Sequence, residues 1–196
     1  QVFDEKRNEE LIGYLLSVDY AGAPAALAQL YTAAEDDGEA RGTMEEFIRM
    51  ETSRFSYRNC IAAEEDGQIL GAVLCYGADR MEELDRPMLE LVREKGRQVQ
   101  SYPKECTGKR FYIDSVGVYG SSRGKGVGTA LIHAAEERGH RLGYDTISLI
   151  VDEKKEKTKK LYERLGFCET GTVTLMGHKY YAMDQKKGEK GQKKSR

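Results

Sequence analysis

Hydrophobic and polar residues in the first quarter of the chain recur with the spacing of amphipathic helices. The pattern predicts one helix over residues 5–16 and a second over residues 24–34. Pro24 suits a helix start, because its missing N–H would have no helical partner there. An acidic stretch at 35–42 then predicts a loop. Thr43, followed three residues later by a glutamate, predicts the capping box of a third helix.

The hydrophobic period changes to that of β-strands near residue 59. Two apolar runs in NCIAAEEDGQILGAVLCYG meet at Asp66 and Gly67, which predicts an antiparallel hairpin. Residues 79–110 are rich in charge and predict one helix, over residues 81–96 and interrupted at Pro87. We expect this segment to lie as an insertion over one face of the sheet.

The second half of the chain alternates strands with helices. RFYIDSVGV (110–118) and DTISLIV (145–151) predict strands, and the segments after them predict helices over 126–141 and from residue 156 to a C-terminal glycine, Gly166. Two further short runs, GTVTLM and KYYAM, joined through Gly177 and His178, predict a closing hairpin. A helix between two strands places them parallel, so the fold class is α/β with a mixed sheet that is parallel at its centre.

Length and composition indicate one domain with a basic tail. A chain of 196 residues is long enough to bury one substantial core, and we assign residues 1–185 to a single domain. Residues 186–196 carry six basic residues, one acidic residue and no apolar one, which predicts a disordered tail. A nucleic-acid contact by this tail is the less favoured alternative. The sequence starts with Gln1, which leaves open whether further residues precede it.

Charge and cysteine usage limit the partners and the compartment. A net charge of -2 and a pI near 6.0 give no reason to expect nucleic acid or a membrane as a partner. The four cysteines form no C-x-x-C pair, no apolar run could span a bilayer, and the first residues are too charged for a signal peptide. We therefore expect a cytoplasmic protein. The three histidines show no metal-ligand spacing, so we expect no metal.

The most informative stretch is a glycine-rich corner between a predicted strand and a predicted helix. In SSRGKGVG, Gly124, Gly126 and Gly128 alternate with other residues, beside Arg123 and Lys125. Free backbone N–H groups and the positive end of a helix make such a corner an anion site. The glycines could serve only a tight turn, but their spacing beside two cations favours phosphate binding.

Three kinds of glycine-rich phosphate loop are candidates for this corner. The order of glycine and lysine excludes a P-loop. The dinucleotide fingerprint lacks its third glycine, because Leu131 stands there, although Asp152 closes the next strand. A dinucleotide site therefore remains the weaker alternative. The third pattern, [QR]-x-x-G-x-[GA], fits the segment from Arg123 to Gly128 without adjustment.

That third pattern belongs to the GNAT superfamily of acyl-CoA-dependent N-acyltransferases, which the chain resembles from about Asp66 to Met183. The segment LYERLGF also matches the family's L-Y-x-x-x-G-F signature, and YIDSVGV and ISLIV are similar to its fourth and fifth strands. The helices before residue 60 match loosely. The resemblance implies a mixed, mostly antiparallel central sheet with a splayed parallel strand pair and flanking helices. It also implies acetyl-CoA as the acyl donor.

The resemblance assigns a cofactor site residue by residue. The backbone of Val116 and Val118 would pair with the pantetheine arm of coenzyme A. Lys155 stands where the family often has asparagine, and Thr158 where it often has alanine, so the usual side-chain contact is altered; Lys155 is kept as a cofactor-binding candidate. The pyrophosphate would lie on the backbone amides of Arg123, Gly124, Lys125, Gly126, Val127, Gly128 and Thr129.

Acyl transfer to an amine needs a base, because a free amine with a pKa near 10.4 is protonated at neutral pH. Asp114 is the candidate, as the one acidic residue of its strand; a turn cap or a pair with a surface cation is its structural alternative. Tyr112, two residues before it, is expected on the same face and could act through water instead. Tyr162 of the L-Y-x-x-x-G-F segment is the candidate acid for the leaving thiolate, with a core tyrosine as its alternative.

These features predict an N-acetyltransferase. It would transfer an acetyl group from acetyl-CoA directly to a primary amine within one ternary complex. The acceptor, a small molecule or a protein amine, should bind between the N-terminal helices and the segment 79–110. Acidic residues at 35–46 could attract it, although a solvated acidic face is the commoner explanation. A homodimer is compatible with the sequence. The alternatives are a non-catalytic coenzyme A sensor, suggested by Lys155 and Thr158, and a nicotinamide-dependent oxidoreductase.

Overall fold

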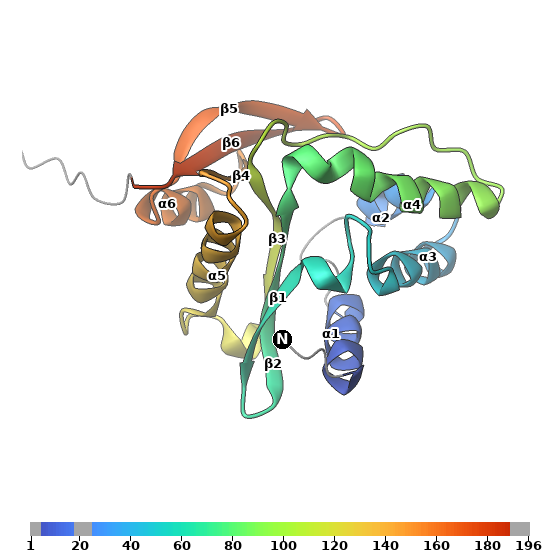
Figure 1. Ribbon diagram of the computed structural model, residues 1–196, viewed down its shortest axis with the longest axis horizontal. Coiled ribbons are helices and arrows are strands. Elements are labelled where there is room, and N and C mark those ends of the chain that lie inside the picture. The colour runs from blue at the N-terminus through green and yellow to red at the C-terminus, as the bar shows by residue number, and fades with distance from the viewer. Residues whose placement is uncertain (1–4, 18–24, 189–196) are drawn as a thin grey trace, which may run out of the picture.

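The computed structural model describes residues 5–17 and 25–188 of the chain. Within these residues a six-stranded sheet stands between two groups of helices (Figure 1). One side of the sheet is covered by α1 (Glu5–Ser17), α2 (Ala25–Thr32), α3 (Asp37–Arg49) and α4 (Met81–Glu94). The other side is covered by α5 (Val127–Arg141) and α6 (Glu156–Arg164).

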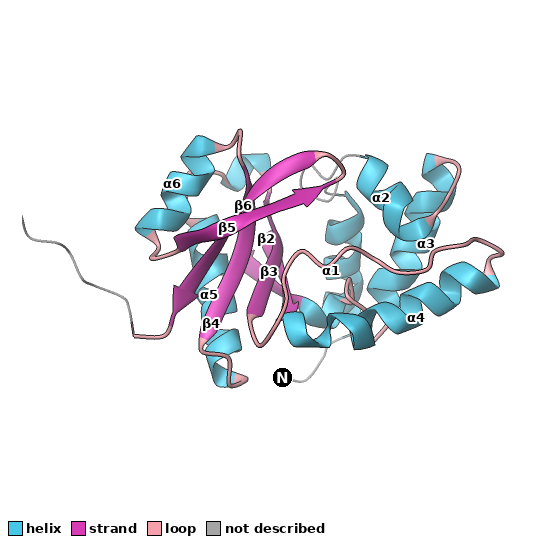
Figure 2. Ribbon diagram, turned by 90° about the horizontal axis from the view of Figure 1, so that it is seen from above, coloured by secondary structure: helices cyan, strands magenta, loops and turns pink. Residues whose placement is uncertain are grey.

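The strands follow the order β1-β2-β3-β4-β6-β5, and Figure 2 shows the strong twist of the sheet. All neighbours are antiparallel except β3 and β4, which are parallel because α5 connects them. This confirms the predicted fold class. The bounds are β1 Cys60–Glu65, β2 Gln68–Gly77, β3 Phe111–Val118, β4 Thr146–Asp152, β5 Cys168–Leu175 and β6 His178–Lys186.

Both predicted hairpins form, through turns of the same kind. Asp66 and Gly67 have φ of 51° and 76°, and they join β1 to β2. Met176 and Gly177 have φ of 50° and 78°, and they join β5 to β6. Positive φ at both central residues is the turn geometry that matches the twist of paired strands. The second turn therefore lies one residue before the predicted position.

The third helix starts earlier than the sequence pattern predicted. Asp36 is the N-cap of α3, and its carboxylate accepts a hydrogen bond from the N–H of Glu39 at 2.9 Å. The predicted loop 35–42 is thus helical from Asp37 onward. Thr43 is buried inside the helix and accepts a hydrogen bond from Arg97, so its predicted capping role is wrong. Burial of its apolar face favours a longer α3. The helix therefore starts after Asp36, which is a stronger N-cap than a threonine.

The helix α4 runs through Pro87 without a break, contrary to the interruption predicted there. The proline removes one hydrogen bond to a carbonyl in the first turn, and that turn is exposed on its outer side. A buried stripe with helical spacing holds the helix against the sheet: Met81, Leu84, Met88 and Val92. Packing of this stripe outweighs the lost hydrogen bond.

Two hydrophobic clusters lie on the two faces of the sheet. The first contains residues of α1–α4 with Leu74, Tyr76 and Tyr112 of the sheet. The second contains residues of α5, β3 and β4. Gly139 lets α5 approach the sheet closely, because a Cβ there would lie 2.6 Å from the side chain of Ile147. The two clusters hold the strands from both sides.

The last described residues overlap the predicted basic tail. Lys186, the first residue of the predicted basic tail, still pairs in β6, and residues 189–196 lie outside the described residues. Pro24 lies outside them as well. Gly166 is confirmed as the glycine that ends α6, with φ of 95° and an N–H bond to the carbonyl of Glu163. Across residues 5–17 and 25–188, no helix has the length and apolar character to cross a membrane.

Candidate active site

The glycine corner, residues 120–128, turns the chain from β3 into α5. Gly124 and Gly126 have φ of 77° and 79°, in the left-handed region where a side chain is strained. Gly126 is the N-cap of α5, and no side chain caps this helix start. The first N–H groups of α5 are therefore available to an anion, and the exposed side chains of Arg123 and Lys125 flank them.

The glycines are required by the turn itself rather than by crowding within the protein. A Cβ built on Gly124 or Gly126 meets no atom within 4 Å, and one on Gly128 meets only a methyl group of Val118 at 3.8 Å. The space next to the corner is therefore open. An open surface with inward-facing backbone donors is what a bound phosphate group requires.

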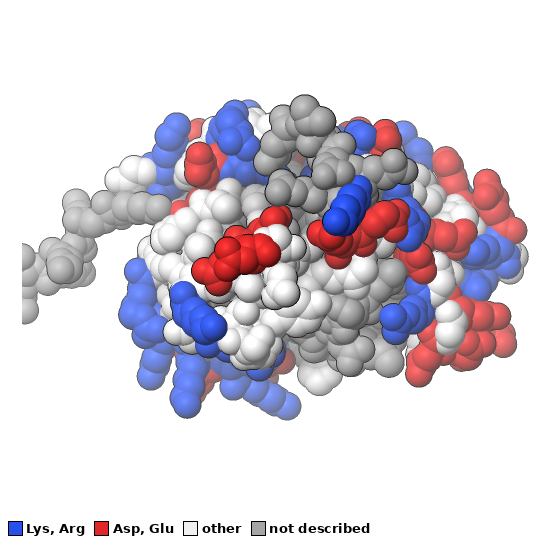
Figure 3. All heavy atoms as spheres, turned by 90° about the horizontal axis from the view of Figure 1, so that it is seen from below, with Lys and Arg blue, Asp and Glu red and all other residues white. Residues whose placement is uncertain are grey.

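Basic side chains gather on the side of the molecule that holds the corner. In Figure 3, Lys and Arg atoms dominate the side where Figure 1 shows α5 and α6, whereas both signs mix over the side of α3 and α4. The exposed basic residues near the corner and the start of α6 are Arg123, Lys125, Lys154, Lys155, Lys157 and Lys160. This positive surface suits a ligand that carries several phosphates.

The parallel strands β3 and β4 separate soon after they meet. They are paired at three positions, the last being Ile113 with Leu149. Beyond these residues the two strands continue, to Val118 and Asp152, without pairing with each other. The backbone of the outer part of β3, including Val116 and Val118, is thereby left without a strand neighbour on the β4 side, and an extended ligand could pair with it.

A β-bulge at Asp114 changes the faces on which β3 presents its side chains. Leu74 of β2 lies opposite Ser115, and Cys75 lies opposite Ile113, so Asp114 has no partner across the ladder. After the bulge, Val116 and Val118 pack toward α5, while Asp114 faces the helices α1–α4 with Tyr76. Sequence alternation alone would have placed Asp114 and Val116 on one face.

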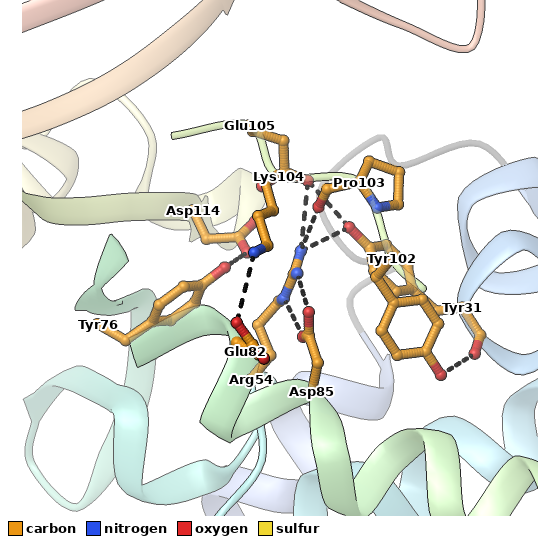
Figure 4. Close-up of polar contacts among 10 residues, drawn as sticks. All are labelled: Tyr31, Arg54, Tyr76, Glu82, Asp85, Tyr102, Pro103, Lys104, Glu105 and Asp114. Carbon is orange, nitrogen blue, oxygen red and sulfur yellow. Dashed lines mark hydrogen bonds and ion pairs between the residues drawn. The ribbon is translucent and has the colours of Figure 1, made fainter. Parts of the chain in front are cut away.

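Asp114 accepts a hydrogen bond from the hydroxyl of Tyr76 at 2.5 Å (Figure 4). Burial raises the pKa of Asp114, although the Tyr76 hydrogen bond and the charge of Arg54 oppose that rise. The two structural alternatives for this residue, a turn cap and a pair with a surface cation, are both wrong. Tyr112 shares its face as predicted but is only 1% exposed, which leaves little room for water at its hydroxyl.

Tyr162 lies on α6 and packs beside the second hydrophobic cluster. It is partly buried, and its ring meets that of Phe167 edge to face, with centroids 6.0 Å apart. Burial raises the pKa of its hydroxyl, so the group keeps its proton at neutral pH. Among the described residues, none forms a hydrogen bond with that hydroxyl. Tyr162 is thus a packing residue whose hydroxyl keeps its proton.

Lys155 is exposed at the N-terminal end of α6, where it occupies the N-cap position without capping the helix by its side chain. The turn before it is closed by Asp152, whose carboxylate accepts the N–H of Lys154 at 2.9 Å. Asp152 therefore has a local structural partner. The side chain of Lys155 extends from the same end of the sheet at which β3 and β4 separate.

Sequence reasoning missed a buried polar network beneath α4, drawn in Figure 4. Arg54 has no exposed side-chain surface, and it binds both carboxylate oxygens of Asp85, at 2.7 and 2.6 Å. A third nitrogen of Arg54 donates to Tyr31 and to the carbonyl of Pro103. Arg54 and Asp85 lie in charged or polar segments without a motif, so no local signal marked them as buried.

Glu105, in the loop before β3, is the second residue that the sequence did not reveal. Its side chain is 9% exposed, one oxygen accepts the hydroxyl of Tyr31 at 2.9 Å, and Arg54 lies 3.8 Å from that oxygen. Burial, and then the charge of Asp114, raises the pKa of Glu105 to about 7. A carboxyl group with such a pKa can accept or release a proton at neutral pH.

Several acidic residues of the segment 35–46 have structural partners. Asp36 caps α3, Glu39 pairs with Arg97 at 3.1 Å, and Glu46 pairs with Lys95 at 2.7 Å. These contacts favour the solvated acidic face over the attraction of an amine. They do confirm that the segment 79–110 is joined to the N-terminal helices.

Comparison with known proteins identifies the family of this chain and solved structures with the same fold. Residues 25–167 match the Acetyltransferase (GNAT) family. No curated protein sequence matches the chain significantly. Among solved structures, the chain is similar to a crystal structure of an acetyltransferase, with a TM-score of 0.74 and 23% identity over 95% of this chain and 97% of the other.

Two further solved structures share the fold. An N-acetyltransferase from Staphylococcus aureus Mu50 has a TM-score of 0.72 and 20% identity, over 91% of this chain and 96% of the other. The polyamine N-acetyltransferase of Drosophila melanogaster, which forms N-acetylagmatine, has a TM-score of 0.58 and 15% identity, over 94% and 97%. At these identities the likeness concerns the fold.

Proposed function

The chain belongs to the GNAT acetyltransferase family, and from this premise we propose that it transfers an acetyl group from acetyl-CoA to a primary amine. The observation that carries the proposal is the bulged strand β3. At the point where β3 leaves β4, Val116 and Val118 pack on the face of α5, and Asp114 lies on the face of α1–α4. Donor and acceptor would approach from these two faces and react directly in one ternary complex.

The donor would bind along the glycine corner and the free edge of β3. The N–H groups at the start of α5 are uncapped by side chains and would hold the pyrophosphate, from Arg123 to Thr129. The pantetheine arm would pair with the backbone of Val116 and Val118. Lys155 and the other exposed cations near the start of α6 would face the phosphate of coenzyme A that lies outside the pyrophosphate.

Asp114 would act as the base. The amine arrives mostly as an ammonium ion, and one of its protons must leave before the nitrogen can attack the thioester carbonyl. The raised pKa of Asp114 brings its proton affinity closer to that of the amine. The attack forms the C–N bond, and the C–S bond then breaks to release a thiolate.

Tyr162 would supply a proton to the departing thiolate. Its hydroxyl keeps its proton because burial raises its pKa, and no described residue holds that proton in a hydrogen bond. After the attack the nitrogen loses a second proton, which would restore Tyr162, and Asp114 would release the first proton to solvent, so that the products are the amide, the free thiol and one proton. A tyrosine hydroxyl is chemically suited to this step.

A non-catalytic coenzyme A sensor is the second candidate function. It is favoured by one observation, the presence of Lys155 and Thr158 where the family often has asparagine and alanine. A nicotinamide-dependent oxidoreductase is not retained, because the sheet is mostly antiparallel and the chain belongs to another family. A cytoplasmic location remains a proposal, supported by four cysteines that form no C-x-x-C pair.

The test is release of free thiol from acetyl-CoA with a panel of small primary amines and lysine peptides. Asp114→Asn should lower kcat/KM by at least about 100-fold and leave the Kd of acetyl-CoA unchanged. Asp145→Asn, at an exposed position just before β4, is the matched control. Tight binding of acetyl-CoA without turnover on any amine would instead support the sensor.

A further inference from the structure

Asp114 uses only one of its two carboxylate oxygens within the described part of the chain. Its Oδ2 accepts the hydroxyl of Tyr76 at 2.5 Å, and no hydrogen bond from a described residue reaches Oδ1. The residue as a whole is partly exposed. The contact with Tyr76 therefore holds one oxygen and leaves the other for a ligand.

The β-bulge is the reason that this side chain needs a contact of its own. Asp114 is the extra residue between Ile113 and Ser115, so it has no neighbour across the ladder to β2. A side chain that lacks such a neighbour can occupy more than one rotamer. A hydrogen bond to Oδ2 from a fixed donor selects one of them.

Tyr76 is a fixed donor because its ring is packed in the first hydrophobic cluster. The residue is 2% exposed, and its ring meets that of Tyr112, its partner across the ladder, edge to face with centroids 5.9 Å apart. Burial, and then the charge of Asp114, raises the pKa of Tyr76 well above its ordinary value. The hydroxyl thus keeps its proton and donates it to the carboxylate in a hydrogen bond (Figure 4).

The titratable groups around Asp114 come from every element packed against it. Besides Tyr76 of β2, they are Tyr31 of α2, Arg54 after α3, Cys60 of β1, Asp85 of α4, Glu105 before β3 and Tyr112 of β3. Arg54, the cation in this set, directs two of its nitrogens to Asp85. Among the described residues, only Tyr76 donates a hydrogen bond to Asp114.

We propose that Tyr76 is a positioning residue for the acyl transfer: it holds Oδ2 of Asp114 and keeps the carboxylate ionised, so that Oδ1 receives the proton of the acceptor. Tyr76 keeps its own proton throughout. The inference rests on the proposed function, in which Asp114 is the base. It adds a residue that lies outside the glycine corner and the LYERLGF segment.

Two opposing effects on Asp114 explain why such a donor is useful. Burial raises the pKa of Asp114, and the Tyr76 hydrogen bond is the strongest influence against that rise, ahead of the charge of Arg54. Burial makes the carboxylate a better base, but too large a rise would leave it protonated before the acceptor arrives. A hydrogen bond to the ionised form limits the rise.

The experiment compares the wild-type protein with Tyr76→Phe, which keeps the packed ring and removes the hydroxyl. The Asp114 carboxyl carbon is followed by ¹³C NMR during a pH titration, and its signal is assigned by its loss in Asp114→Asn. We expect its midpoint to rise by about one pH unit. With the fastest amine of the panel, the acidic limb of the pH profile of kcat/KM should move up equally, and the plateau above it should fall about tenfold.

Tyr144→Phe is the matched control, since it removes the same kind of bond, from a tyrosine to Asp79 at 2.7 Å. It should leave the Asp114 midpoint and the pH profile unchanged. A folded Tyr76→Phe protein with the wild-type midpoint and pH profile would overturn the inference, because a purely structural tyrosine affects stability alone. Failure of the proposed function is a different result, a wild-type protein that acetylates no amine.

Discussion

Arg54 and Asp85 form a buried pair in which two parallel hydrogen bonds, at 2.7 and 2.6 Å, join the segment after α3 to the middle of α4. Their side chains are 0% and 6% exposed. Burial raises the pKa of Asp85, and the hydrogen bonds and charge of Arg54 oppose that rise. The same arginine reaches the loop before β3 through the carbonyl of Pro103, so one residue holds three segments together.

Asp85→Ala should therefore lower the free energy of unfolding by roughly 3–5 kcal/mol, because it leaves the buried charge of Arg54 without the carboxylate that accepts two of its hydrogen bonds. Urea denaturation followed by circular dichroism would measure the loss. Glu46→Ala, which breaks the half-exposed pair with Lys95, is the control and should cost far less. Similar losses in the two variants would show that the buried pair has no special weight.

Tyr162→Phe should reduce kcat by roughly 100-fold while the Kd of acetyl-CoA stays unchanged, because only the proton for the leaving thiolate is removed. The packing of the ring against Phe167 is preserved in this variant. Thiol release under saturating substrates measures the effect, and Tyr181→Phe, which alters a tyrosine near Lys159, serves as the comparison. Unchanged turnover would exclude Tyr162 as the acid.

Gly124→Ala and Gly143→Ala separate backbone strain from ligand binding. Both glycines have positive φ, 77° and 90°, and a Cβ on either meets no atom within 4 Å. Each substitution should lower the free energy of unfolding by about 1 kcal/mol, because an alanine is strained there. Only Gly124→Ala should weaken acetyl-CoA binding in calorimetry, since Gly143 follows the other end of α5. Equal acetyl-CoA affinities would place the pyrophosphate elsewhere.

Glu105 predicts a pH dependence of stability. Its pKa is raised from 4.5 to about 7 in the folded protein, so the folded state binds the proton more tightly than the unfolded chain. The resulting stabilisation is fully present below pH 4.5 and is lost as the pH rises through 7. The urea midpoint of the wild-type protein should therefore fall relative to that of Glu105→Gln between pH 5 and 8. A difference that stays constant over this range would show that Glu105 titrates normally.

The local elements of this protein were predictable because their causes lie within a few residues. Asp66 and Gly67 fix a hairpin by their own backbone preferences, and Gly166 ends α6 by adopting a conformation that other residues avoid. The glycine corner is of the same kind, since Gly124 and Gly126 turn a strand into a helix whatever surrounds them. The family resemblance also depended on such short segments.

Where prediction failed, packing had decided between local alternatives. The sequence around Thr43 satisfies a capping pattern, but burial of the apolar face of α3 favoured Asp36 as the helix start. Pro87 is a local signal for a helix end, and the buried stripe of α4 overrode it. Both outcomes depend on contacts with the sheet, which sequence periodicity does not contain.

The sequence alone predicted the strand–turn–helix corner that we propose for the donor, and it named Asp114 and Tyr162 as candidates. What surrounds Asp114 became visible in the folded protein. A bulge against β2 turns it away from Val116, and residues 54, 85 and 105, far apart in the chain, meet behind it. A hydrogen bond or a pKa shift between such residues arises when folding excludes water from their charges, and no local pattern records which distant charges will be buried together.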